Sequence, residues 1–201
     1  MRTLYYVPII HAIEDYGSLR PAIAEASKKR IGAVQFDELQ KKIHDYWRVV
    51  EERIEKAISN VSGLIIYQDS FPAGDREKIL IHFGYLLGDQ SKSKSPNFQL
   101  IKKLVDKGAI LEGTEELSLI VEQVMIYKEA ANAKMLLEQN QVLAKYAERS
   151  LKLVKLRDEF IAKRIRDTLP DDGKGILFIG KDHDVISELD KLPEKFKVIY
   201  L

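Results

Sequence analysis

The sequence predicts an α/β fold with a mostly parallel sheet of about five strands, helices on both faces and a long helical region before the penultimate strand. Two observations support this fold class. Short apolar segments rich in β-branched residues recur along the chain, as expected of strands buried on both faces. Segments with apolar residues at three- and four-residue spacing separate them, as expected of helices. The 201 residues are expected to form one domain, 1–201, with a helix-rich segment at 114–169.

The first third of the chain predicts two strands separated by two helices. Leu4–Ile10 is an almost unbroken apolar run and predicts the first strand. Ser18 is a plausible N-cap of the following helix, which is expected to end near Gly32. The short apolar segment 64–68 predicts the second strand. The intervening helix is predicted by one apolar stripe: Phe36, Leu39, Ile43, Trp47, Val50, Ile54 and Ile58.

The middle of the chain predicts two helices and a third strand. A helical pattern runs from Asp75 to Leu87 and leads into 91–97, the most loop-like segment of the sequence. Phe98–Lys107 predicts another helix, which Gly108 ends. The next residues, 109–111, predict a short strand.

The last part of the chain predicts the long helical region and two more strands. Residues 114–169 contain no glycine or proline, which predicts either one bent helix or two helices packed as a hairpin. The segment 175–180 predicts the clearest buried strand. A short helix over Val185–Leu189 is expected to connect it to a last strand at 196–201.

Composition and charge exclude several classes of function. The 32 basic and 31 acidic side chains give a net charge of +1, so no overall field favours nucleic acid or an anionic membrane. The chain has no cysteine, which excludes disulfides, thiolate catalysis and cysteine-ligated zinc. We therefore expect a cytoplasmic protein whose partner is a small-molecule or peptide substrate, with no nucleic acid and no membrane. The helical region could support a homo-oligomer.

Common catalytic and nucleotide-binding motifs do not occur in the sequence. There is no Walker-type loop, no GxGxxG, no HExxH helix and no Gly-x-Ser-x-Gly elbow. The segment 1–11 lacks a small-residue cleavage site and is expected to form a strand rather than a signal peptide.

The residues that follow the predicted strands are the candidate site, because ligands of open parallel sheets bind beyond the carboxyl ends of the strands. Each histidine among them could simply cap a strand, but a pair at two strand ends indicates a general base or a metal site. Two other histidines, His44 and His82, fall within predicted helices and are expected to be structural or surface residues. The candidates are His11, Asp69, Glu112, Glu115, Asp182 and His183.

An arginine interrupts the apolar stripe of the long helical region. Counting back from Leu169 in steps of four leads through two isoleucines to Arg157, so a guanidinium lies on the face that otherwise points to the core. A buried arginine must pair with a carboxylate or bind an anionic ligand, and the alternative is that its side chain reaches along the helix to water. Asp158 is either its local partner or faces solvent.

Two segments carry a resemblance to a known superfamily. RDEFIAKRI at 157–165 and ILFIGKDH at 176–183 resemble the paired signature of the TraB, Tiki and erythromycin esterase-like superfamily, which includes the ChaN-like proteins. In that group an Arg-Asp or Arg-Asn helix motif precedes a strand ending in Gly-x-x-His, here Gly180 to His183. The matching place after the first strand is Pro8 to His11, with proline where the family has glycine. The resemblance implies an α/β fold and a site of two histidines, an arginine and acids, with Asp69 or Glu112 as the acid after the second strand.

Two hypotheses of function follow. The first is a hydrolase that activates water to cleave an ester or an amide, either without metal or with a divalent metal ion held by His11, His183 and Glu112. In the metal-free version one histidine is the general base, Glu112 orients it and Arg157 stabilises the carbonyl oxygen. The second hypothesis is a non-catalytic ligand-binding or regulatory protein that uses the same crevice. Further binding residues are expected to be Asp69, Glu115, Asp158 and Asp182.

Overall fold

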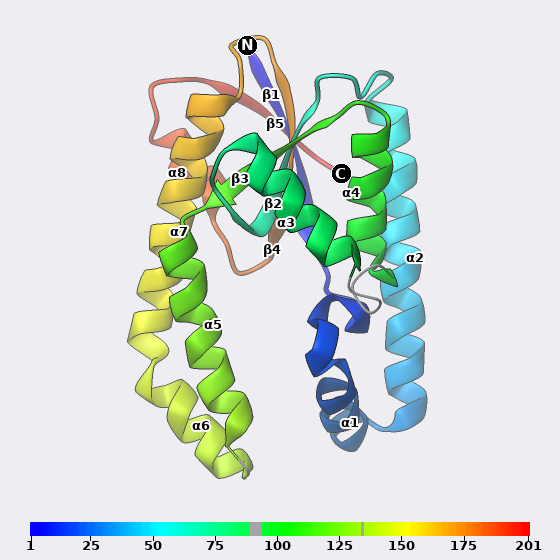
Figure 1. Ribbon diagram of the computed structural model, residues 1–201, viewed down its shortest axis with the longest axis vertical. Coiled ribbons are helices and arrows are strands. Elements are labelled where there is room, and N and C mark those ends of the chain that lie inside the picture. Colours follow the sequence, from blue (N-terminus) through cyan, green and yellow to red (C-terminus); the bar gives the residue numbers. More distant parts are fainter. Residues whose placement is uncertain (89–93, 134) are drawn as a thin grey trace.

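The computed structural model describes residues 1–88, 94–133 and 135–201. Within these ranges five strands form one all-parallel sheet in the order β3-β2-β4-β1-β5 (Figure 1). This arrangement confirms the predicted α/β fold. The strands are β1 (Arg2–Ile9), β2 (Ile65–Pro72), β3 (Ile110–Glu115), β4 (Lys174–Gly180) and β5 (Phe196–Tyr200).

Outside the region 114–169 the predicted helices are present, with ends that differ from the expected ones by a few residues. The first of them is preceded by a 3₁₀ segment that bends at Gly17, whose φ of 53° is in the left-handed region. The helical elements are η1 (Ile13–Leu19), α1 (Arg20–Ile31), α2 (Ala33–Ala57), α3 (Arg76–Gly88), α4 (Pro96–Asp106), α5 (Leu117–Asn132), α6 (Leu136–Lys145), α7 (Ala147–Thr168) and α8 (Val185–Asp190).

Helices cover both faces of the sheet, as the fully apolar strands require. On one face, α2, α3 and α4 pack on the sheet, and Trp47 of α2 lies against Phe178 of β4 with the ring centroids 6.3 Å apart. On the other face, α7 and α8 pack on the alternate residues of the same strands, with Ile161 and Ile165 fully buried. Successive residues of β4 therefore point into two different cores.

The region 114–169 differs from both predicted arrangements. Its described residues form three helices, because α5 ends at Asn132, α6 runs from Leu136 to Lys145, and a break at Tyr146 separates α6 from α7. Helices α5 and α7 run alongside each other, and α6 joins them at the end far from the sheet (Figure 1). The hairpin alternative is thus the nearer one, with a short extra helix at its tip.

The described part of the segment 91–97 also differs from its expected loop conformation. Residues 91–93 lie outside the described residues. Ser95 accepts a hydrogen bond from the backbone N–H of Phe98 and caps α4, which begins at Pro96. Proline at the first helical position and serine at the N-cap are both favourable, so the end of the segment belongs to the helix.

Two strands continue beyond their predicted ends. β2 runs to Pro72 and β3 runs to Glu115, with a shift of register between Gln68 and Pro72. The hydroxyl of Thr114 donates to the carbonyl oxygens of Gln68 and Phe71 and ties the irregular part of β2 to β3. The residues predicted to follow the third strand therefore lie inside it.

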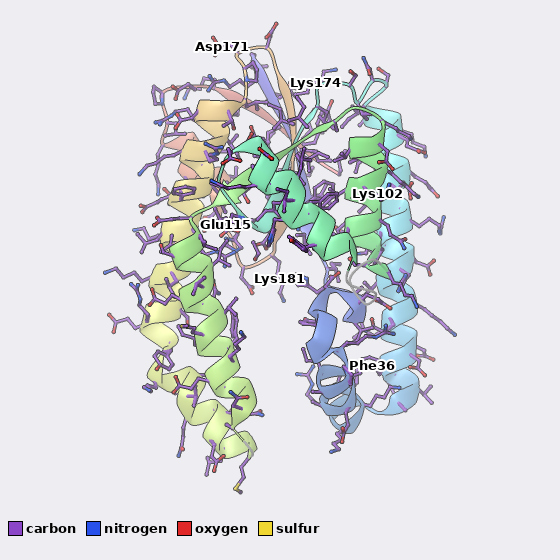
Figure 2. All side chains as sticks on the ribbon, viewed as in Figure 1. Phe36, Lys102, Glu115, Asp171, Lys174 and Lys181 are labelled. Atoms are coloured by element: carbon purple, nitrogen blue, oxygen red, sulfur yellow. The ribbon has the colours of Figure 1, made fainter. Side chains whose placement is uncertain are left out.

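All five strands point their carboxyl ends at the same edge of the sheet. Beyond this edge, η1, α1 and α2 extend on one side and α5, α6 and α7 on the other (Figure 1). Glu115, where β3 leads to α5, and Lys181, in the loop after β4, both lie at this edge (Figure 2). Among the described helices, none combines the length and the apolar character that a membrane crossing would need.

Candidate functional site

A cavity of about 540 Å³ opens at the carboxyl edge of the sheet. His11 after β1, Asp69 of β2 and His183 after β4 all line it. Arg157 of α7 and Asp182 also line it. The structure therefore brings both predicted histidines and the predicted arginine to one place.

His183 forms a close pair with Asp158. Its Nδ1 hydrogen-bonds to Asp158 Oδ1 at 2.5 Å, and the backbone N–H of Asp184 donates to Asp158 Oδ2 at 2.9 Å. Both side chains are only 6% exposed. Because a carboxylate accepts, the proton lies on Nδ1, and Nε2 is the nitrogen that can accept a proton. Asp158 thus fixes the orientation of the ring.

Opposing effects set the pKa of His183. Burial is the largest effect and by itself lowers the pKa of the ring, because it disfavours the charged imidazolium. The hydrogen bond to Asp158 and the charge of Asp69 act in the other direction and prevail, so the pKa of His183 is raised above its ordinary value. The imidazolium that forms when His183 accepts a proton is therefore stabilised by two carboxylates.

His11 forms a second histidine–aspartate pair. Its Nδ1 lies 3.2 Å from Asp15 Oδ2, and the same oxygen accepts the backbone N–H of Ala12 at 2.9 Å. The hydrogen bond to Asp15 is the main reason why the pKa of His11 is raised, while burial opposes it. The side chain of His11 is 50% exposed, so it reaches the cavity from its open side.

Arg157 is buried and paired with acids. One terminal nitrogen donates to Glu115 Oε1 at 2.9 Å and to Asp69 Oδ1 at 2.8 Å. Its Nε donates to the other oxygen of Glu115, and its second terminal nitrogen donates to the side-chain oxygen of Gln123. All three nitrogens thus have acceptors within the protein. Of the alternatives left open for Arg157, pairing with carboxylates is the one the structure shows.

The two carboxylates that share Arg157 differ in pKa. Burial and the nearby charge of Asp69 raise the pKa of Glu115, although the hydrogen bonds from Arg157 oppose this. Burial also acts to raise the pKa of Asp69, but the charges of His183 and Arg157 outweigh it and lower that pKa. The guanidinium of Arg157 is bonded to both carboxylates, so protonation of one affects the pKa of the other, and Asp69 is the carboxylate that stays ionised.

Gly180 makes room for the approach of Asp69 to His183. Its backbone N–H donates to Asp69 Oδ2 at 3.0 Å. A Cβ at this position would lie 3.0 Å from the same oxygen and 3.7 Å from Cδ2 of His183. A side chain would therefore enter the space between the carboxylate and the ring. This gives a physical reason for glycine three residues before the histidine.

Glu112 does not join the site. It lies within β3, and its side chain pairs with Arg164 of α7. It is not among the cavity-lining residues, so the prediction that Glu112 follows the strand and orients a histidine is wrong in its geometry. The cause is the unrecognised extension of β3, which brings Glu115 rather than Glu112 to the strand end.

The predicted metal ligands do not form a cation site. His11 and His183 line the cavity, but Glu112 is held elsewhere by Arg164. Across the described ranges, no three histidine or acidic side chains are grouped so that they could hold a metal ion. The donor set therefore does not fit the metal-dependent version of the hydrolase.

Several residues of the site were not predicted from the sequence. Asp15 is hydrogen-bonded to His11, and Gln123 is hydrogen-bonded to Arg157. His82, which was expected to be a structural or surface residue, lines the cavity. Its ring packs edge-on against Phe71, with the ring centroids 5.1 Å apart. Ser70 is the one non-glycine residue of the described chain with a left-handed φ, 60°, and its hydroxyl lies 3.0 Å from Asp69 Oδ1. The spacing of Asp15 four residues after His11 was a usable signal; none marked Gln123.

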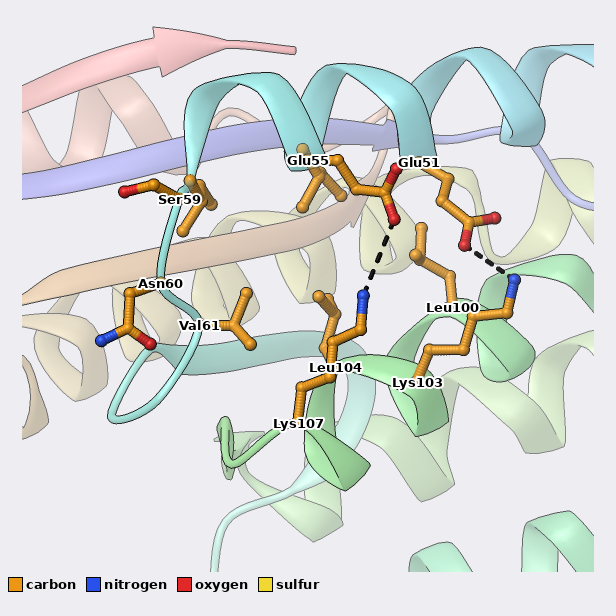
Figure 3. A pocket seen from close by; sticks show the side chains of 11 residues that line it. Glu51, Glu55, Ser59, Asn60, Val61, Leu100, Lys103, Leu104 and Lys107 are labelled. Carbon is orange, nitrogen blue, oxygen red and sulfur yellow. Dashed lines mark hydrogen bonds and ion pairs between the residues drawn. The ribbon is translucent and has the colours of Figure 1, made fainter.

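A second cavity, of about 300 Å³, lies between the carboxyl ends of α2 and α4 (Figure 3). Glu51 pairs with Lys103 at 2.7 Å and Glu55 with Lys107 at 3.6 Å across it. None of the predicted site residues lines this cavity. Its charges neutralise one another, so we regard it as part of the interface between the two helices.

Comparison of the chain with protein-family models, with curated proteins and with solved structures finds no match.

Proposed function

We propose that the protein is a hydrolase that cleaves an ester or amide bond by general acid–base catalysis in the cavity at the carboxyl edge of the sheet. The observation that carries this proposal is that two histidines line one cavity and each is hydrogen-bonded through Nδ1 to an aspartate. This arrangement leaves Nε2 of each ring for proton transfer. A pair of imidazoles can supply both the base and the acid that hydrolysis requires.

His183 is the general base of the proposed reaction. Its Nε2 takes a proton from a water molecule whose oxygen attacks the carbonyl carbon, and Asp158 stabilises the resulting imidazolium. Burial favours the neutral ring more strongly at His183, with its 6% exposed side chain, than at His11. The more buried ring therefore suits the base.

His11 is the general acid of the same reaction. Its pKa is raised mainly by the hydrogen bond to Asp15, which favours the protonated form. When the tetrahedral intermediate collapses, the bond from carbon to the leaving oxygen or nitrogen breaks and His11 donates its proton to that atom. The products are an acid and an alcohol or amine, one water is consumed, and a proton passes from His183 to His11 through solvent to restore the starting state.

Arg157 acts on the site indirectly. It holds Asp69 and Glu115, and Asp69 in turn accepts from the backbone of Gly180 beside His183. Arg157 is thus a positioning residue in this proposal. The resemblance of 157–165 and 176–183 to the TraB, Tiki and erythromycin esterase-like superfamily supports the same site, and membership of that superfamily and a cytoplasmic location are parts of the proposal.

The competing proposal is a ligand-binding protein without catalysis. It is favoured by one observation, namely that the nitrogens of Arg157 are all bonded to acceptors within the protein. Catalysis of ester cleavage is aided by a donor at the developing oxyanion. A cavity in which the arginine is already paired is compatible with binding alone.

The experiment that separates the two proposals measures turnover of a panel of 4-nitrophenyl esters and fluorogenic peptides in the presence of EDTA. We expect turnover that falls at least 100-fold in His183→Ala, with an unchanged circular dichroism spectrum. His44→Ala is the matched control, because His44 is a half-exposed histidine on α2 outside the cavity. Turnover retained in His183→Ala refutes its role as base. Ligand binding that depends on His183, without turnover in the wild type, supports the competing proposal.

A further inference from the structure

One wall of the cavity is a stripe of α5. Ile120, Gln123, Val124 and Tyr127 all line the cavity, and their spacing of three and four residues places them on one face of the helix. Gln123 turns its oxygen to Arg157 and donates from its nitrogen to the hydroxyl oxygen of Tyr127 at 3.1 Å. The polar member of the stripe is thus satisfied by the protein, and the other members present apolar surface.

The apolar surface continues onto the neighbouring elements. Val154 of α7, Phe71 of β2 and Phe98 of α4 line the same cavity. Val124 is 41% exposed and Tyr127 is 55% exposed. An apolar wall that is open to solvent beside two histidine–aspartate pairs is typical of a site that binds an apolar group of a ligand.

The charges of the lining residues disfavour an anionic ligand. Among the described residues that line the cavity, the basic side chains are Arg157 and three histidines. Arg157 is bonded to Asp69 and Glu115, and two of the histidines are bonded to aspartates. Asp182 adds a further carboxylate at the rim. A carboxylate or phosphate on the ligand would therefore meet acids rather than a free cation.

We infer that the substrates are esters or amides of uncharged, apolar acyl groups, and that the acyl group lies along the α5 wall. The inference rests on the proposed hydrolase, because that proposal places the carbonyl carbon next to His183. The cavity of about 540 Å³ lies within the range of roughly 300–1,000 Å³ that is usual for small-molecule sites. It has room for a medium-length chain or an aromatic ring in addition to the reacting group.

The first part of the test compares 4-nitrophenyl esters whose acyl chains increase from acetate to octanoate. Burial of one methylene stabilises by about 0.8 kcal/mol, so kcat/KM should increase about fourfold for each added methylene until the wall is covered. The matched anionic substrate is the 4-nitrophenyl half-ester of suberic acid, which has the same chain length and ends in a carboxylate. We expect its kcat/KM to be at least tenfold below that of the octanoate ester.

The second part of the test uses matched variants of α5. Val124→Asp places a charge on the cavity wall, and Val124→Ser is a milder change at the same position. Val121→Asp is the control, because Val121 is 43% exposed on the same helix but does not line the cavity. The ratio of kcat/KM for octanoate to that for acetate should fall at least tenfold in Val124→Asp, fall less in Val124→Ser and stay unchanged in Val121→Asp.

A binding measurement makes the result independent of turnover. Fluorescence of the neutral probe N-phenyl-1-naphthylamine should increase on binding to the wild type and to Val121→Asp, and should increase much less with Val124→Asp. If esters are hydrolysed with no dependence on chain length or on Val124, the inference is overturned and the hydrolase stands. If the probe binds in a Val124-dependent manner but no ester or amide is hydrolysed, the apolar site stands and the hydrolase fails.

Discussion

Replacement of Asp158 by asparagine tests the proposed base most directly. Asp158 accepts a hydrogen bond from His183 Nδ1 at 2.5 Å and another from the backbone of Asp184 at 2.9 Å. Asparagine keeps the size of the side chain but removes its charge. A hydrogen bond to a charged group contributes roughly 1.5–3 kcal/mol, so kcat/KM should fall by about 10- to 150-fold at neutral pH.

The pH profile of the same variant shows whether Asp158 acts through His183. In the wild type the pKa of His183 is raised, and the neutral base is lost as the pH falls through this raised pKa. Without the Asp158 charge, burial dominates and the pKa of His183 falls, so the acidic limb of kcat/KM should move to lower pH. The loss of rate should therefore be smaller at acidic than at neutral pH.

The control for this prediction is Asp184→Asn in the same loop. Asp184 accepts a hydrogen bond from the backbone N–H of Ser187 and caps α8, whereas the carboxylate bonded to His183 is that of Asp158. Asp184→Asn should leave the acidic limb unchanged. An acidic limb at the same pH in Asp158→Asn as in the wild type, in a protein with wild-type circular dichroism, would refute the reasoning.

Three further predictions concern the buried charges. Arg157→Met leaves the two carboxylates that Arg157 bridges without their cation. The free energy of unfolding, measured in urea, should fall by about 3–5 kcal/mol. The control Arg48→Met, on the surface of α2, should change it by less than about 1 kcal/mol. Gly180→Ala places a Cβ 3.0 Å from Asp69 Oδ2. This variant should destabilise the fold by about 1–3 kcal/mol and move the acidic limb of the activity profile. An unchanged Tm and an unchanged pH profile would contradict the close approach of Asp69 to His183. The pKa of Asp69 is lowered from its ordinary 3.8. The stabilisation that Asp69 contributes is therefore complete above pH 3.8 and is lost as the pH falls through the lowered pKa. The Tm difference between the wild type and Asp69→Asn should accordingly shrink below about pH 4.

The sequence predicted the elements well where one local pattern determined them. The short apolar run at 175–180 is bounded by glycines and predicts a buried strand, the single apolar stripe of α2 predicts an amphipathic helix, and the structure contains both. β2 and β3 were predicted too short because polar residues, a proline and a glycine follow their apolar parts, and because the last residues of the two strands pair through an irregular ladder. A register shift of this kind depends on the neighbouring strand and leaves no periodic signal in its own sequence.

The candidate site was predicted in part. His11 and His183 follow strands that lie next to each other in the sheet, so parallel topology alone brings them to one edge. The acids that hold Arg157 could not be assigned, because Glu115 is 42 residues and Asp69 is 88 residues away in the chain. Glu112 and Glu115 are both glutamates near the end of the third strand, and only the length of β3 decides which of them lies at the strand end.

The sequence by itself determined the class of fold, the edge of the sheet at which the candidate site lies and the two histidines of that site. These features follow from local periodicity and from the rule that parallel strands end on one side. The tertiary structure alone decided that Arg157 is bonded to Glu115, Asp69 and Gln123, that Asp158 belongs to His183, and that α5 provides an apolar wall. Such contacts join segments far apart in the chain, and their geometry depends on strand lengths and helix packing that no single segment encodes.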